Sequence, residues 1–108
     1  MLIKSSDKHG YRLLTIEQDT FTAEHVEELQ SLISENLRNK VLRIALSLTP
    51  ATYPYSQIIS LLVKCTRQIE EAGGSLVVVQ PNRMFHDVCR KLNLDAVLKI
   101  VLSEEDLV

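Results

Sequence analysis

Apolar residues recur along this chain with two periods that alternate from one segment to the next. Apolar and polar residues alternate at positions 11–16 and 41–48, which predicts two strands. An unbroken apolar run at positions 76–79 predicts a strand that is buried on both faces. Residues 2–4 and 97–102 are expected to form the first and the last strand.

Between these strands, apolar residues at intervals of three and four predict three helices. Thr22 and Asn82 are suited to cap the first and the third helix, because their side-chain oxygens accept from free N–H groups. We place Pro54 at the first position of the second helix, where its missing N–H costs nothing. The apolar faces are Val26, Leu29, Ile33 and Leu37; Ile58, Leu62, Cys65, Ile69 and Ala72; and Phe85, Val88, Cys89 and Leu92.

Turn residues separate the predicted elements. Residues 7–10 are expected to turn between the first two strands, with Gly10 at positive φ, and so to form a hairpin. One glycine of the pair 73–74 should adopt the left-handed conformation and end the second helix, and Asn93 should do the same after the third. Residues 103–106 have the cap and the first-turn acids of a helix start.

The order of elements is therefore β-β-α-β-α-β-α-β. Three successive β-α-β units predict an α/β fold, in which an N-terminal β-hairpin precedes alternating strands and helices. The central sheet should be mainly parallel and flanked by helices. A length of 108 residues fits a single domain that spans positions 1–108.

Composition and charge narrow the class of protein. With 45% hydrophobic and 24% charged residues, the chain has the composition of a folded globular domain. Its net charge is −2 and its basic residues are scattered, which argues against a nucleic-acid partner. The sequence contains neither a signal-peptide pattern nor an apolar run of membrane-spanning length, so we expect no direct insertion into a membrane.

The two cysteines indicate a cellular compartment. Cys65 and Cys89 both fall on apolar faces of predicted helices. We therefore expect buried thiols rather than a disulfide or a metal-binding pair. Free thiols are typical of a reducing compartment, which predicts a cytoplasmic protein.

Residue types that can act in catalysis do not occur at the spacings that catalysis requires. His9, His25 and His86 fall on separate elements without neighbouring ligands, so we expect structural histidines and no metal site. The serine at the start of the second helix lacks the glycines of a nucleophile elbow. The glycine pair precedes a strand, so it is not a phosphate-binding loop, which argues against nucleotide binding. We expect neither an enzyme nor a cofactor.

The segment between the third strand and the second helix, residues 49–57, contains two tyrosines and two prolines. One interpretation is a preset turn in which Tyr53 and Tyr55 are half-buried against the edge of the sheet. The other is a recognition surface, because tyrosine offers rigid contact area with a polar tip. Ser56 falls in the first helical turn, where free N–H groups and the helix dipole favour a phosphate.

This order of elements, with this loop before this helix, resembles the STAS domain of anti-sigma-factor antagonists. The shared features are a strand that ends in Leu-x-Leu, an aromatic residue before the second helix, a glycine pair before an apolar strand, and the turns around the first and third helices. They fall on Asp19-Thr20-Phe21-Thr22, Leu46-Ser47-Leu48, Tyr53, Gly73-Gly74 with the strand at 76–79, and Asn93-Leu94. The resemblance covers most of the chain and implies the fold derived above.

The phosphorylation switch of that family is altered in this sequence. The family motif, Asp-Ser-Ser/Thr-Gly, corresponds to Tyr55-Ser56-Gln57-Ile58. The serine that the family phosphorylates is kept as Ser56, whereas the aspartate, the second hydroxyl and the glycine are replaced. Tyr55 removes a charge and adds bulk. Ile58 is expected to place a branched side chain where a kinase needs close approach to the backbone.

The resemblance implies a regulator that binds a serine kinase acting as an anti-sigma factor. Binding would use the loop and the N-terminus of the helix near Pro54, and phosphorylation of Ser56 would end it. The alternative is an accessory or scaffold STAS subunit of an ABC-type lipid transporter or a signalling assembly, without a serine switch. The oligomeric state is left open. The expected partner-binding residues are Tyr53, Tyr55, Ser56, Gln57, Ile59 and Ser60.

Overall fold

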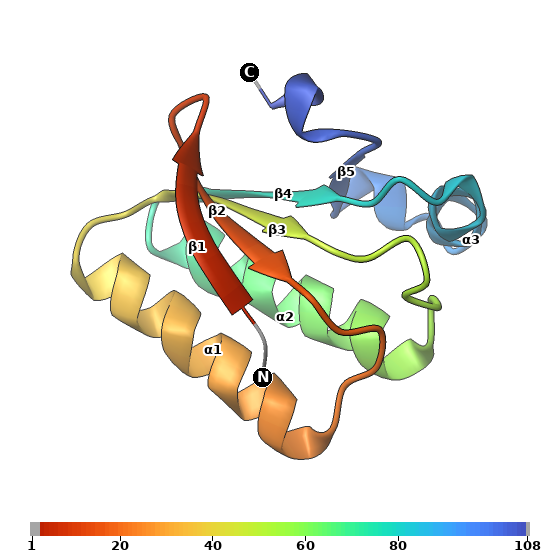
Figure 1. Cartoon of the computed structure of the whole chain (residues 1–108), viewed down its shortest axis with the longest axis horizontal. Helices are drawn as coiled ribbons and strands as arrows, with labels where there is room; N and C mark the ends of the chain where they lie inside the picture. The colour runs from red at the N-terminus through yellow and green to blue at the C-terminus, as the bar shows by residue number, and fades with distance from the viewer. Residues whose placement is uncertain (1–2, 108) are drawn as a thin grey trace.

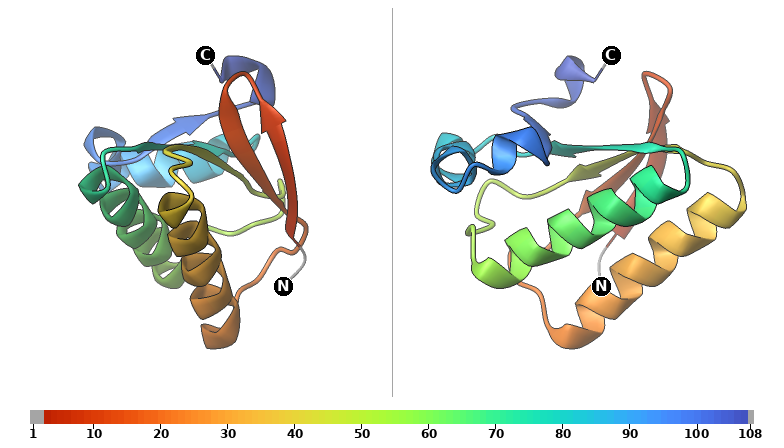
Figure 2. Two further views of the ribbon diagram at one scale, coloured as in Figure 1. Left: turned by 90° about the vertical axis from the view of Figure 1, so that its left-hand side faces the viewer. Right: turned by 180° about the vertical axis from the view of Figure 1, so that it is seen from behind.

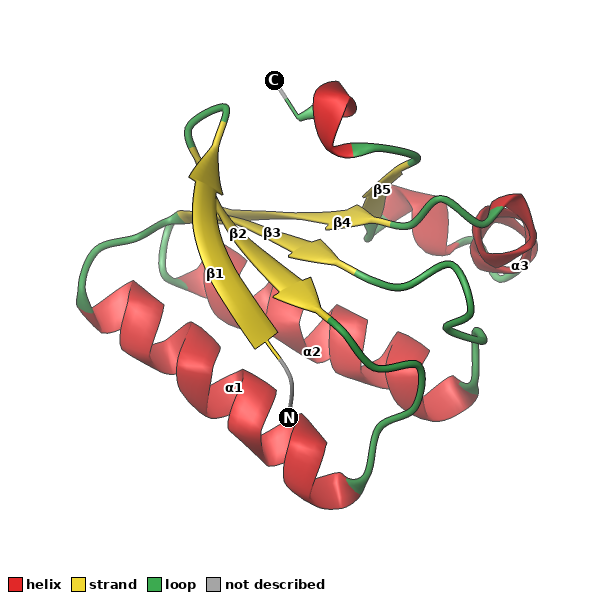
Figure 3. Cartoon of the chain, viewed as in Figure 1, coloured by secondary structure: helices red, strands yellow, loops and turns green. Residues whose placement is uncertain are grey.

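A computed structural model describes residues 3–107 and contains one five-stranded sheet, with the strands in sequence order (Figure 3). β1 (Ile3–Lys8) and β2 (Tyr11–Ile16) pair antiparallel as a hairpin. Each later strand is parallel to the one before it; these strands are β3 (Arg43–Ser47), β4 (Ser75–Val79) and β5 (Lys99–Val101). The predicted α/β fold with a hairpin and a mainly parallel sheet is confirmed.

Two long helices, α1 (Ala23–Arg38) and α2 (Ser56–Glu71), lie side by side across one face of the sheet (Figures 1 and 2). The shorter α3 (Arg83–Lys91) lies at the β5 end of the sheet. Two single-turn 3₁₀ helices, η1 (Leu94–Ala96) and η2 (Glu104–Asp106), flank β5. Within the described residues, no helix has the length and apolar character needed to cross a membrane.

The buried side chains form two clusters, one on each face of the sheet. The larger cluster joins the sheet to the helices and includes Leu14, Leu46, Leu62 and Phe85. The smaller cluster consists of Tyr11, Leu13, Ala45, Val77, Val79 and Leu107. Because successive residues of β4 alternate between the two clusters, both faces of this strand are buried, as its apolar run predicted.

The capping and turn residues take the conformations that the sequence predicted. Thr22 Oγ1 accepts from His25 N at 3.2 Å, and Thr22 N donates to His25 Nδ1 at 3.1 Å, which forms a capping box at the start of α1. Gly73 (φ +87°) and Asn93 (φ +58°) are both left-handed and end α2 and α3. These predictions succeeded because each depends on neighbouring residues alone.

The N-terminal hairpin is longer than predicted, because β1 continues through Lys8. His9 and Gly10 alone make the turn, with φ values of 52° and 83°. Two successive positive φ angles are those of a type I′ turn, whose twist suits a two-residue hairpin. Asp7 and Lys8 therefore pair with β2 instead of turning, although two successive polar residues show no alternation in the sequence.

Two predictions near the C-terminal end of the described chain were wrong. Leu92 was expected on the apolar face of the third helix but is 56% exposed, because α3 ends at Lys91 and the chain turns away at Asn93. The last strand, expected over 97–102, is reduced to β5 because Val97 N and Leu98 N donate to Leu94 O in the turn that follows η1. The third strand is likewise shorter than 41–48 at both ends.

Cys65 and Cys89 are buried, free thiols in the larger cluster, in agreement with the sequence prediction of buried cysteines. Burial raises the pKa of the Cys65 thiol to about 12, because the apolar surroundings disfavour the thiolate. The pKa of Cys89 is raised for the same reason. Neither thiol is therefore activated as a nucleophile.

We expect the Cys65→Ala variant to lose less stability than the native chain when the pH is raised. The unfolded thiol ionises near pH 9, whereas the folded thiol keeps its proton to about pH 12, so stability falls as pH rises between these values. Raising the pH from 8 to 10 should cost the native chain about 1.4 kcal/mol more than the variant. Urea unfolding at both pH values measures this difference. An identical pH slope in the two chains would contradict the buried, protonated thiol.

Candidate functional site

The carboxyl ends of β2, β3 and β4 bring three loops together at one edge of the sheet (Figure 1). In open α/β sheets, ligands bind outside the carboxyl ends of the strands. The loop between β3 and α2, residues 48–55, contains the unusual tyrosines and prolines. It is fixed to both neighbouring loops by hydrogen bonds.

On one side, Thr49 ties this loop to the loop between β2 and α1. Thr49 Oγ1 donates to Asp19 Oδ1. The hydroxyl of Thr52 lies 3.0 Å from that of Thr49, and Thr52 N donates to Thr49 O at 3.1 Å. Thr52 is 1% exposed, so its hydroxyl has exchanged water for the Thr49 hydroxyl.

On the other side, Gln80 ties the loop to the start of α3. This residue is fully buried directly after β4. Its side chain donates from Nε2 to Thr49 O at 3.1 Å and accepts at Oε1 from Asn82 N at 3.0 Å. Asn82 Nδ2 donates to Pro50 O at 3.0 Å, and His86 Nε2 donates to Gln80 O at 2.7 Å. A buried amide with both ends bonded fixes the positions of the groups around it.

The loop then reaches α2 through a tight turn at Pro54. Tyr55 N donates to Tyr53 O at 2.8 Å, which closes a three-residue turn with Pro54 at its centre. Tyr55 is extended (φ −67°, ψ 156°) and is the N-cap, so α2 begins at Ser56, two residues later than predicted. The side chain of Tyr55 makes no capping hydrogen bond, which leaves the N-terminus of α2 uncapped.

Tyr53 and Tyr55 are 53% and 54% exposed, so about half of each residue's surface is open to solvent, which both interpretations of this segment allow. Their rings are 4.9 Å apart between centroids and tilted by 46°. Such tilted aromatic pairs are attractive and hold their rings in place. The pair forms an exposed aromatic surface beside the start of α2.

The predicted partner-binding residues on α2 fall on two faces of the helix. Ser56, Gln57 and Ser60 are exposed on the face that continues from the tyrosines. Ile59 is 8% exposed and packs in the larger cluster, so its inclusion among the surface residues was wrong. Ile58 is 3% exposed and also packs inward. Its branched side chain was expected to obstruct close approach to the backbone, but it does not lie on the outer surface.

The exposed face of α2 borders a groove that sequence reasoning missed. This groove, of about 340 Å³, lies between α1 and α2. Residues that line it include Val26, Glu27 and Gln30 of α1 and Gln57, Ser60 and Lys64 of α2. Its α1 side could have been found only from the pairing of the two helices, which no local pattern specifies.

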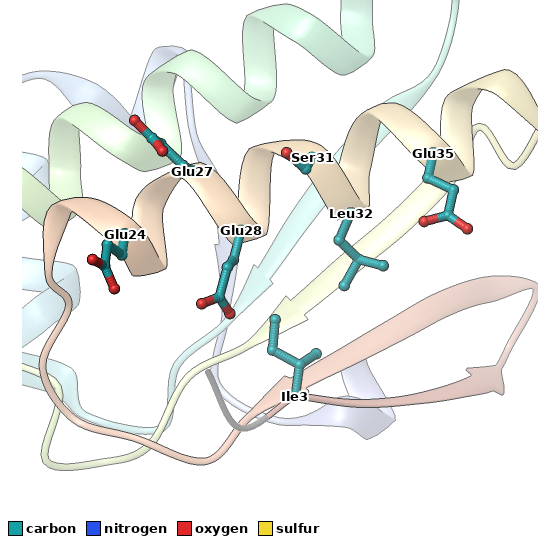
Figure 4. A pocket seen from close by; sticks show the side chains of 7 residues that line it. All are labelled: Ile3, Glu24, Glu27, Glu28, Ser31, Leu32 and Glu35. Atoms are coloured by element: carbon teal, nitrogen blue, oxygen red, sulfur yellow. The ribbon is translucent and has the colours of Figure 1, made fainter.

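A second groove, of about 680 Å³, lies between α1 and β1 and contains none of the predicted site residues. Glu28, Leu32 and Glu35 point from α1 toward Ile3 of β1, whereas Glu27 points to the other side of the helix (Figure 4). The carboxylates make this the solvated, acidic side of α1.

Histidines and possible metal ligands do not gather at either groove. His25 and His86 accept or donate the structural hydrogen bonds described above, and His9 Nε2 lies 3.8 Å from Glu105 Oε2. Across residues 3–107, no three His, Cys, Asp or Glu side chains come close enough to hold a metal ion.

Comparison with known proteins identifies the family of this fold. A model of the STAS domain family matches residues 6–107. No curated protein sequence matches the chain.

Two solved structures share the fold at low sequence identity. The NMR structure of the protein TM1081 is 17% identical, with a TM-score of 0.72 over 98% of this chain and 85% of that one. The phosphorylated form of the Bacillus cell fate determinant SpoIIAA is 13% identical, with a TM-score of 0.63 over 96% of this chain and 95% of that one.

We expect Gln80→Leu to destabilise the chain by about 1–3 kcal/mol, because Asn82 N loses its acceptor and Thr49 O keeps only the bond from Thr52 N. Exchange of the Thr52 amide, which bonds to Thr49, should accelerate with it. Gln68→Leu is the matched control, since it removes one partly buried bond to Ser34. Urea unfolding and hydrogen exchange measure both effects. Equal losses in the two variants would contradict the role assigned to Gln80.

Proposed function

We propose that this chain, which belongs to the STAS domain family, acts by binding a protein partner at the carboxyl edge of its sheet and not by catalysis. The docking surface consists of Tyr53, Tyr55, Ser56, Gln57 and Ser60, with the adjoining groove between α1 and α2. The proposed partner is a serine kinase that acts as an anti-sigma factor, in the cytoplasm.

The observation that carries this proposal is the exposed tyrosine pair on a loop that hydrogen bonds of the buried residues Thr52 and Gln80 hold in place. Tyrosine is enriched where proteins bind one another, because it buries much area and loses little conformational freedom. A loop that is already ordered loses less entropy on binding than a mobile one. The groove beside it, with Glu27 on one side and Lys64 on the other, offers room for a protruding side chain.

Phosphorylation of Ser56 would act on this surface directly. Ser56 is exposed at the first position of α2, between the tyrosines and the groove. A phosphate adds a charge of about −1.5 to −2, and the uncapped helix N-terminus favours it there. The chain therefore tolerates the phosphate, while a partner packed over Tyr55 and Gln57 would have to bury or pair the new charge. SpoIIAA, an anti-sigma-factor antagonist of similar fold, has a solved phosphorylated form.

We expect Tyr53→Ala and Tyr55→Ala each to weaken binding of the purified partner at least tenfold, and Ser56→Asp to weaken it as well. The partner is first captured from the protein's own cells and identified by mass spectrometry. Lys4→Ala, on the exposed strand β1, is the surface control and should bind normally. If both tyrosine variants and Ser56→Asp bind like the native chain, the docking surface is wrong.

The alternative function is an accessory STAS subunit of an ABC-type lipid transporter or a signalling assembly. Replacement of the aspartate and glycine of the family switch by Tyr55 and Ile58 favours it. In that case the captured partner is a permease or an ATPase, and the tyrosine variants weaken binding while Ser56→Asp does not. Site mapping of protein isolated from its own cells separates the two functions, since only the switch requires phosphate on Ser56.

A further inference from the structure

The second face of the sheet is covered differently from the first. α1 and α2 lie across one face, whereas the other face bears the side chains of the smaller cluster and is approached by η2 (Figures 1 and 2). We call Tyr11, Leu13, Ala45, Val77 and Val79 the second-face seat; each is at most 5% exposed. Leu107, 1% exposed, is the member of this cluster that comes from outside the strands.

The segment that contributes Leu107, residues 103–107, is attached to the rest of the chain by a few side chains. Lys8 Nζ contacts Glu104 Oε1 at 3.3 Å and Glu105 Oε1 at 3.0 Å. The backbone bonds from Asp106 N to Ser103 O and from Leu107 N to Glu104 O both close within the segment. Ion pairs as exposed as these contribute little, so the single leucine is the main anchor.

The charges of the seat and of the segment are complementary. Lys8 and His9 stand at the hairpin end of the seat, and the Arg43 guanidinium lies 4.3 Å over the Tyr11 ring. The segment brings Glu104 and Glu105 to this basic rim. Glu105 raises the pKa of Lys8, and Lys8 lowers the pKa of Glu105, as expected for an attractive contact between charged forms.

We propose that the second-face seat is a binding site for a short acidic peptide segment with a leucine, and that residues 103–107 occupy it as an exchangeable internal ligand. The segment itself shows the chemistry that fits the site. Glu104 and Glu105 contact Lys8, and Leu107, two residues later, packs against the apolar side chains of the seat. A partner segment of this kind competes with an occupant whose tether gives it a high effective concentration, so it binds when the internal segment is weakened or displaced. This site lies on the other face of the sheet from α1 and α2 and is independent of the tyrosine surface.

The test uses the synthetic peptide acetyl-Ser-Glu-Glu-Asp-Leu-amide, titrated into the full chain and followed by amide chemical shifts. We expect the Leu107→Ala variant to bind it at least tenfold more tightly than the native chain, with shifts at Tyr11 and Leu13. A peptide in which serine replaces the leucine should bind at least tenfold more weakly. Equal affinity of the native chain and Leu107→Ala, or of the two peptides, would overturn the proposal.

A second measurement does not depend on the folding of Leu107→Ala. A glutamate-specific protease should cleave after Glu104 or Glu105 about threefold faster in Lys8→Ala than in the native chain, because loss of the Lys8 contacts weakens the attachment of the segment, while Leu107 remains its main anchor. Lys4→Ala, which removes a lysine of the same strand that pairs with Glu17, is the matched control. Equal cleavage of Lys8→Ala and Lys4→Ala would show that the segment is not held as proposed and would overturn it.

Discussion

The side chain of Gln80 sets the geometry on which the proposed docking surface depends. An amide that is fully buried at the end of a central strand must bond to its surroundings, and here those surroundings are Thr49 and Asn82. The same constraint that satisfies the amide therefore joins the loop before α2 to the start of α3. Tyr53 and Tyr55 are presented from a loop held by the core and not from a free one.

The two proposed binding surfaces lie on different parts of the sheet. The parallel strands bury both faces, but helices cover only one of them, where they also form the groove beside Ser56. The opposite face receives Leu107 from a short acidic segment held by Lys8. A partner at the carboxyl edge and a peptide on the second face could then be bound at once, because neither surface uses the residues of the other.

The sequence predicted what local patterns determine. Thr22 begins a helix through a hydrogen bond to a residue close in sequence, and Gly73 and Asn93 end helices through their own positive φ angles. These predictions were confirmed because each depends on a short stretch of sequence. Ile59 was misplaced because α2 buries a wider face than the predicted apolar face that begins at Ile58, and Ile59 and Leu61 are buried beside it. The Gln80 network and the seat of Leu107 join residues far apart in the chain, and no spacing in the sequence reveals such contacts.

The proposed docking surface requires that the loop before α2 is held in one conformation before any partner binds. Backbone order parameters of the free chain at Thr52, Tyr53, Tyr55 and Ser56 test it most directly. We expect values of about 0.85, equal to those within α1 and α2, because the Gln80 and Thr49 bonds hold this loop to the core. Values below about 0.6 at these residues would mean a mobile loop, and would contradict a preformed docking surface.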